Sequence, residues 1–235
     1  LLEMTRFFVL FDKKVGKVAA RYQQVFGIKR LLERINTFEP SPQPSSGGRG
    51  CRKGGVIWHT TGSGKSFTMV FLSKALILHE SLKQCRIVVV TDRVDLEAQL
   101  SKTFSTGGEL ASKKDKAAAM ATSGKRLAEQ IATGTGRIIF TIINKFAIAA
   151  KMPECRNLSP DMIVLVDEGH RSQGGENYIR MRQALPNAAF VAFTGTPLLK
   201  DDKTTNKFGP IIHAYTMQRA VEDKTVTPLL NEERI

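Results

Sequence analysis

Residues 58–66, which read Trp-His-Thr-Thr-Gly-Ser-Gly-Lys-Ser, have the composition of a phosphate-binding loop. Glycines let a backbone wrap closely around phosphates, and the amides of such a loop and of the following helix attract negative charge. Lys65 has the spacing to reach the outer phosphates, and the Ser66 hydroxyl suits Mg²⁺. The segment follows a strand-like run and opens a helical pattern, although His59 stands where the strict Walker A pattern has Gly. We therefore predict nucleotide contacts from Thr61, Gly62, Ser63, Gly64, Lys65 and Ser66.

A second candidate for chemistry is the pair Asp167 and Glu168, which follows the apolar run 163–166. One carboxylate can hold Mg²⁺ through water while the other orients and deprotonates the water that attacks the γ-phosphate. Alone, such a pair after a strand more often marks a surface turn. Here it begins 102 residues after Lys65 (167 minus 65), with two predicted strands between, and this favours hydrolysis. We predict Lys65, Asp167 and Glu168 as catalytic residues, Ser66 and Asp167 as metal ligands, and ATP with Mg²⁺ as cofactors.

Short apolar runs alternate with helical patterns along most of the chain, and this alternation predicts the elements that position these groups. The short runs, mostly rich in Val and Ile, are typical of buried parallel strands and occupy residues 56–58, 87–91, 138–143, 162–167 and 189–194. Helices are predicted at 21–35, 65–79, 94–104, 123–132 and 178–185. This order predicts a doubly wound α/β sheet with its ligand at the carboxyl ends of the strands. Residues 39–55, with three prolines and five glycines, are expected to form a flexible basic loop.

The composition is that of a folded, basic protein. Thirty-five Lys plus Arg against 22 Asp plus Glu give a formal charge of +13, which favours nucleic acid as a partner. On charge alone, basic residues scattered over a solvated surface are an equally good explanation. Cys51, Cys85 and Cys155 lie far apart, so reduced buried thiols are expected rather than disulfides or zinc ligands. The absence of a long apolar run or a signal sequence predicts a cytoplasmic protein without a membrane partner. A first residue other than Met, and a strand-like stretch at 226–230, suggest a piece of something longer.

Residues 167–170, Asp-Glu-Gly-His, resemble the DEAD/DEAH box of superfamily two helicases, with Gly169 in place of the commoner Ala. More narrowly, the chain resembles type I restriction endonuclease R subunits in segments 21–24, 58–66, 90–96, 141–146, 167–173, 193–198 and 208–223. The resemblance covers nearly the whole chain and is weakest at 39–55 and 107–120. It implies a RecA-like P-loop NTPase with a mainly parallel sheet covered by helices on both faces. The implied organisation is a helical lead-in with a Q motif (1–38), the basic loop (39–55), ATP-binding lobe 1 (56–215) and a connection to a second lobe (216–235).

The resemblance also implies roles for further residues. Gln24 matches the adenine-reading glutamine of the Q motif, with Gln23 the less favoured neighbour. The residues that would couple hydrolysis to DNA movement are His170, Thr194, Gly195 and Thr196, and those near DNA are Asp92, Arg93 and Lys145. On chemistry alone each has an ordinary alternative. Gln24 could be a solvated glutamine on a helix face, and His170 a polar residue with its hydrogen bonds satisfied. Residues 194–196 could form a strand-ending turn, Asp92 and Arg93 a surface ion pair, and Lys145 a solvated lysine.

The function implied is that of an ATP-dependent translocase lobe that moves double-stranded DNA before cleavage, in a complex with modification (methyltransferase) and specificity subunits. Neither a nuclease motif nor a second motor lobe is recognisable in the 235 residues, so we expect the chain to bind nucleotide better than it hydrolyses it. The alternatives are a repair helicase or type III restriction subunit, a nonhydrolytic DNA-binding scaffold of the same fold, and a small-molecule P-loop kinase. Motifs of this kind leave open the DNA recognition sequence, the direction and step size of movement, the stoichiometry and the role of the loop 39–55.

Overall fold

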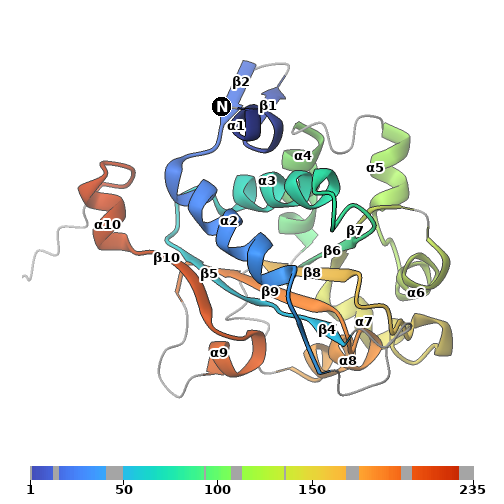
Figure 1. The fold of residues 1–235 in the computed structure, drawn as a ribbon. Helices are drawn as coiled ribbons and strands as arrows, with labels where there is room; N and C mark the ends of the chain where they lie inside the picture. The colour runs from blue at the N-terminus through green and yellow to red at the C-terminus, as the bar shows by residue number, and fades with distance from the viewer. Residues whose placement is uncertain are drawn as a thin grey trace, which may run out of the picture.

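The computed structural model of the chain describes residues 2–12, 16–40, 50–92, 94–106, 113–134, 136–167, 175–196 and 203–227. Its centre is a sheet of six parallel strands in the order β10-β5-β9-β8-β6-β7 (Figure 1). These strands are β5 (Gly55–His59), β6 (Arg86–Thr91), β7 (Ile138–Ile142), β8 (Met162–Asp167), β9 (Ala189–Thr194) and β10 (Ile211–Tyr215). Because all six run in the same direction, their carboxyl ends meet at one edge of the sheet.

Two apolar cores lie on opposite faces of this sheet. On β6, Ile87 and Val89 face the first core, while Val88 and Val90 face the second, and all four are fully buried. Successive side chains of a strand point to opposite faces, so a strand covered on both sides is apolar throughout. The continuous apolar runs of the sequence follow from this burial, and the predicted doubly wound α/β fold is confirmed.

Helices cover both faces of the sheet (Figure 1). Side chains of α2, α3 and α4 enter the first core, and those of α6, α7 and α8 enter the second. The bounds are α1 (Leu2–Phe7), α2 (Tyr22–Ile35), α3 (Lys65–Leu78), α4 (Val94–Thr106), α5 (Lys113–Ala119), α6 (Gly124–Thr133), α7 (Phe146–Ala149), α8 (Glu176–Ala184), α9 (Lys203–Phe208) and α10 (Met217–Glu222), with short 3-10 turns at Ile143–Lys145 and Pro153–Cys155. The five predicted helices and five predicted strands are therefore confirmed to within about two residues at each end.

The amino-terminal lead-in contains more than helix. Before α2, the chain forms α1 and an antiparallel pair of strands, β1 (Val9–Asp12) and β2 (Gly16–Ala19). The pair contributes Leu10 to the first core. At the other end, the strand-like interpretation of 226–230 fails for Val226 and Thr227, which form no strand; the rest of that stretch lies outside the described residues.

Residues 39–55 are not simply a flexible loop. The strand β3 (Phe38–Glu39) pairs antiparallel with β4 (Cys51–Arg52). Arg52 is 5% exposed; its Nη2 lies 2.7 Å from Asp161 Oδ1 and its guanidinium packs over the Phe38 ring at 4.5 Å. The sequence placed Arg52 in a flexible basic loop. The structure shows that Arg52 instead anchors this hairpin beside the amino end of β8, because a buried guanidinium requires a partner. Residues 41–49 lie outside the described part of the chain.

Candidate nucleotide-binding site

The predicted phosphate loop joins β5 to α3 at the carboxyl edge of the sheet. Gly62 and Gly64 have φ angles of 83° and 89°, in the left-handed region that favours glycine. Gly64 is also the N-cap of α3, and no side chain caps the helix. The first amides of an uncapped helix lack intrahelical partners, so this end of α3 retains donors for an anion. The local backbone therefore has the features that phosphate binding requires.

The neighbouring strand β9 brings its own terminal residues against this loop. Trp58 on β5 is in register with Thr194 on β9, and Trp58 Nε1 donates a hydrogen bond of 3.2 Å to the Gly195 carbonyl. A Cβ added to Gly195 would lie 3.0 Å from Thr61 Oγ1 and 3.3 Å from Lys65 Nζ. The Thr196 amide donates to Thr194 Oγ1 at 3.2 Å. Three of the four predicted coupling residues thus lie together beside the loop, and Gly195 permits its closest approach.

Asp167 terminates β8, which is the next strand along from β9. It is 8% exposed and in register with Phe193, one residue before Thr194. The structure therefore brings Asp167 to the same sheet edge as the phosphate loop, one strand removed from β5. Glu168 and His170, the predicted catalytic base and fourth coupling residue, lie outside the described residues. Oxygen donors such as the Ser66 hydroxyl and the Asp167 carboxylate are the ligand type that Mg²⁺ prefers, so the donor set fits this metal.

The two Q-motif glutamines differ in what their side chains contact. Gln24 is 3% exposed; its Oε1 accepts from the Arg21 amide at 2.8 Å, and its Nε2 donates to the Gly64 carbonyl at 3.0 Å and to Thr68 Oγ1 at 3.2 Å. Gln23 is 1% exposed, and its Nε2 is buried without a hydrogen-bond acceptor in the described structure. Gln24 thus binds the phosphate loop itself, whereas the unsatisfied amide belongs to the neighbour that the motif favoured less.

His59 pairs with His213, and no motif predicted this contact. Its ring is fully buried at the end of β5, and its Nε2 lies 2.9 Å from Nδ1 of His213 on β10. Burial, followed by the charges of His213 and Lys65, lowers the pKa of His59 to about 3. Burial also lowers the pKa of His213. Both rings are therefore neutral at pH 7. The only sequence signal was the departure from glycine at position 59.

The predicted DNA contacts are less clearly arranged. Asp92 follows β6 at the carboxyl edge and is half-buried, and its Oδ1 has no hydrogen-bond donor in the described structure. Arg93 lies outside the described residues. Lys145 Nζ lies 3.1 Å from Glu97 Oε1, and the two side chains are 16% and 5% exposed. A phosphate contact by Lys145 would therefore have to compete with an ion pair that is already formed.

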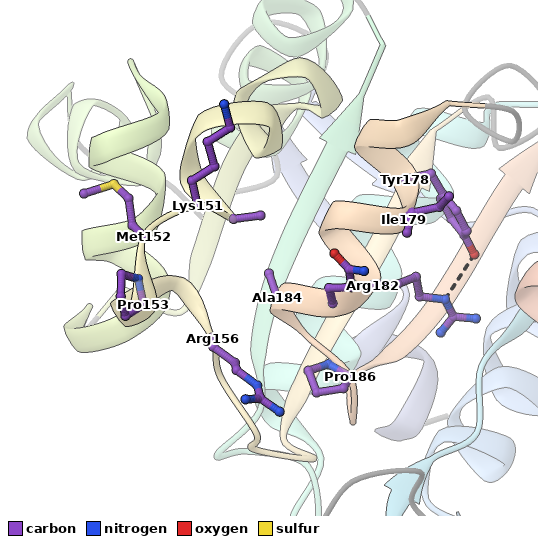
Figure 2. Close-up of a pocket in the computed structure, with 11 residues that line it drawn as sticks. Lys151, Met152, Pro153, Arg156, Tyr178, Ile179, Arg182, Ala184 and Pro186 are labelled. Carbon is purple, nitrogen blue, oxygen red and sulfur yellow. Dashed lines mark hydrogen bonds between the residues drawn. The ribbon is translucent and has the colours of Figure 1, made fainter.

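A separate groove lies on the second face of the sheet, between α8 and the chain that follows α7 (Figure 2). It has a volume of about 950 Å³ and contains none of the predicted nucleotide or DNA residues. Lys151 and Arg156 lie along one side, and Arg182, whose Nε donates to the Tyr178 hydroxyl at 3.1 Å, lies on the other. The groove is thus a surface feature distinct from the phosphate loop.

The buried thiols are as expected: Cys51, Cys85 and Cys155 are all buried and free. Within the described ranges, no helix is long and apolar enough to cross a membrane.

Comparison with known proteins places this geometry in a family. The SWI2/SNF2 ATPase family matches residues 23–235. The chain is 37% identical to the type I restriction enzyme HindI endonuclease subunit of Haemophilus influenzae over 99% of its length, and 34% identical to the putative type I restriction enzyme MjaIXP endonuclease subunit of Methanocaldococcus jannaschii over 100%. It spans only 23% and 22% of those proteins.

Solved structures confirm the fold. The Sulfolobus solfataricus SWI2/SNF2 ATPase core in complex with dsDNA superposes with a TM-score of 0.58 at 14% identity, over 87% of this chain and 37% of that one. The RecA-like architecture and the resemblance to type I restriction endonuclease subunits are thereby confirmed. By the match over residues 23–235, this chain belongs to the SWI2/SNF2 ATPase family.

Proposed function

We propose that this chain is the ATP-binding lobe of a double-stranded DNA translocase, part of a type I restriction endonuclease subunit that hydrolyses ATP with Mg²⁺ to move DNA before cleavage. The observation that carries the proposal is the contact between the phosphate loop and the end of β9, with Lys65 Nζ 3.3 Å from a Cβ added to Gly195. Two relatives named as type I restriction endonuclease subunits support the class of enzyme. Motors of this kind require a loop that binds phosphate beside a strand that responds to it.

The residues of this edge fit ATP with Mg²⁺. Lys65 and the amides of residues 61–66 bind the phosphates, while Ser66 and Asp167 hold the metal. When bound, Mg²⁺ neutralises charge on the phosphate oxygens. Glu168 orients and deprotonates the attacking water. The positive-φ glycines of the loop and the uncapped end of α3 support this assignment.

Recognition of the base is assigned to the start of α2. The side-chain amide of Gln24, which the Q motif predicts to read adenine, accepts a hydrogen bond from Arg21 and donates to Gly64 and Thr68. We propose that Gln24, which is bonded to the phosphate loop, reads the base as the Q motif predicts, with Gln23 as the less favoured alternative. The preference for ATP over GTP in Gln23→Ala and Gln24→Ala separates the two: we expect loss of the preference in Gln24→Ala alone, and loss in Gln23→Ala alone would assign the base to Gln23.

Binding of a fluorescent ATP analogue in the presence of Mg²⁺ tests the site. A charge-assisted hydrogen bond contributes about 1.5–3 kcal/mol, so Lys65→Ala should weaken binding roughly 10- to 100-fold. Lys83→Ala, which removes an exposed lysine beyond α3, is the matched control and should bind as the parent does. Equal affinity of Lys65→Ala and the parent would refute the site.

Coupling to DNA is assigned to His170, Thr194, Gly195 and Thr196, and DNA contact to Asp92, Arg93 and Lys145. The proposed partners are double-stranded DNA and the modification (methyltransferase) and specificity subunits of a restriction complex, in the cytoplasm. ATP hydrolysis by the complete protein is the test, because the chain spans under a quarter of its relatives. Covalently closed duplex circles should stimulate hydrolysis, since a translocase needs no free end.

A second superfamily two enzyme, such as a repair helicase or type III restriction subunit, is the alternative. Preferential stimulation by single-stranded DNA would favour a strand-separating helicase. A DNA affinity that is insensitive to ATP would favour a nonhydrolytic scaffold. The intact pair of phosphate loop and β8 carboxylate argues for hydrolysis over the scaffold.

A further inference from the structure

The last described part of the chain borders the phosphate loop. The Thr60 amide donates to the Tyr215 carbonyl at 3.0 Å, so the loop begins hydrogen-bonded to the end of β10. Further along, a Cβ added to Gly62 would lie 3.6 Å from Val226 Cγ2. Val226 belongs to residues 223–227, which follow α10 and are here named the exit segment. The exit segment therefore lies beside the loop, as the end of β9 does.

A cluster of polar side chains fixes the exit segment to α2. Asp223 Oδ2 accepts hydrogen bonds from the Tyr22 hydroxyl and, at 2.9 Å, from the Tyr215 hydroxyl. The Tyr215 hydroxyl is also 3.1 Å from Thr225 Oγ1, and Arg219 Nε is 3.5 Å from Asp223 Oδ1. The hydrogen bond from Tyr22 is the main cause that lowers the pKa of the Asp223 carboxyl, which is therefore charged at pH 7. One carboxylate thus joins α2, β10 and α10.

The turn that ends α10 aims the exit segment at the loop. The Thr225 amide donates to the Ala220 carbonyl at 2.8 Å, and the Lys224 amide donates to the Val221 carbonyl at 2.9 Å. These two bonds, with Lys224 at a φ of 55°, form a Schellman ending in which the reversing residue is usually glycine. Because the turn fixes the direction of the chain, Val226 comes next to Gly62.

The phosphate loop, the start of α2 and the exit segment form a closed set of neighbours, here called the circuit. Tyr22 and Gln24 lie on the first turn of α2: Tyr22 bonds to the exit segment, and Gln24 bonds to the Gly64 carbonyl at 3.0 Å. The loop, the start of α2 and the exit segment therefore contact one another in turn. A change in the position of the loop changes the distances on both other sides of the circuit.

We propose that the exit segment is a nucleotide-responsive element, in which Asp223 and Val226 make the conformation of the phosphate loop and that of residues 223–227 depend on each other. This rests on the proposed function, because it requires the loop to bind nucleotide. Coupling of this kind is reciprocal: if nucleotide changes the stability of the exit segment, then weakening the segment changes nucleotide affinity by the same factor.

Hydrogen exchange and nucleotide affinity test the proposal on the same protein. In the parent, a saturating nonhydrolysable ATP analogue with Mg²⁺ should change the exchange rates of the amides of residues 224–226 by about fivefold or more. Asp223→Ala should change the dissociation constant of the analogue by a similar factor. Glu222→Gln, in the same turn but bonded to Arg219 and Gln218, is the matched control and should leave the dissociation constant unchanged. Tyr22→Phe removes one hydroxyl that donates to Asp223, at a half-exposed position, and tests the same coupling if Asp223→Ala does not fold.

The outcomes separate this inference from the function on which it rests. A parent that binds no nucleotide overturns both. Binding without a change in exchange at 224–226, or with unchanged affinity in the folded Asp223→Ala or Tyr22→Phe variant, overturns the coupling alone. We expect nucleotide to change the exchange rates at 224–226 in the parent. We also expect the nucleotide affinity to change in Asp223→Ala or Tyr22→Phe and to stay unchanged in Glu222→Gln.

Discussion

Acidification should destabilise this protein through His59. The ring is fully buried, and burial lowers its pKa from 6.5 to about 3. The unfolded chain therefore binds a proton between pH 6.5 and 3 that the folded chain does not. Stability contributed by the neutral ring is fully present above pH 6.5 and is lost as the pH falls through this window, by about 1.4 kcal/mol per pH unit. Between pH 7.5 and 5.0 the loss attributable to His59 is about 2 kcal/mol.

Urea unfolding at the two pH values measures this loss. Trp58, the single tryptophan, adjoins His59 and supplies the fluorescence signal. The variant His59→Gln retains hydrogen-bonding capacity but cannot titrate, so its free energy of unfolding should fall by about 2 kcal/mol less than that of the parent over the same range. Titrating groups away from the His59–His213 pair are common to both proteins and cancel in the comparison.

A second variant separates burial from charge. Among the described residues, His213 is the only other titratable side chain within hydrogen-bond distance of the His59 ring, and Lys65 adds a further charge. Because burial is the first cause of the shift, His213→Gln should retain most of the pH dependence. If parent and His59→Gln lose equal stability between pH 7.5 and 5.0, the histidine is not held neutral by burial and this reasoning is wrong.

Three further substitutions probe other contacts. Gly195→Ala places a methyl group 3.0 Å from the phosphate loop and should weaken nucleotide binding about tenfold in calorimetric titration, whereas Gly175→Ala, with nothing nearer than 3.9 Å, should not. Arg52→Met removes the guanidinium from the Asp161 carboxylate and should lower the free energy of unfolding by about 2–4 kcal/mol in urea; adding Asp161→Asn should restore part of this stability. Lys224→Gly relieves a left-handed backbone and should raise stability by about 0.5–1 kcal/mol in a thermal scan.

The central strands and the phosphate loop could be predicted because their signals are local. β6 and β8 are buried on both faces, so residues 87–90 and 162–166 are continuously apolar, and burial leaves little choice of residue type. The phosphate loop can be recognised in the sequence because its backbone needs glycines at positions 62 and 64. In both cases the physical constraint acts on residues that are adjacent in sequence.

What could not be predicted depends on partners distant in sequence. β10 is a half-exposed edge strand whose sequence, Ile-Ile-His-Ala-Tyr, mixes apolar and polar residues; it is a strand because it pairs with β5, more than 150 residues earlier (211 minus 56 at the first paired residues). The hairpin ending in Arg52 depends on Asp161, and the roles of the two glutamines depend on how α2 packs against the loop. No local pattern contains this information.

The departure from the Walker A pattern at His59 has a structural explanation. A required glycine marks either a positive φ or a close approach, and His59 has neither need, because it ends β5 in extended conformation while the positive φ angles lie at Gly62 and Gly64. The imidazole packs against the facing helix α2, where a Cβ added to Gly27 would lie 3.5 Å from His59 Nε2. The backbone at position 59 therefore does not need the glycine that the strict Walker A pattern places there.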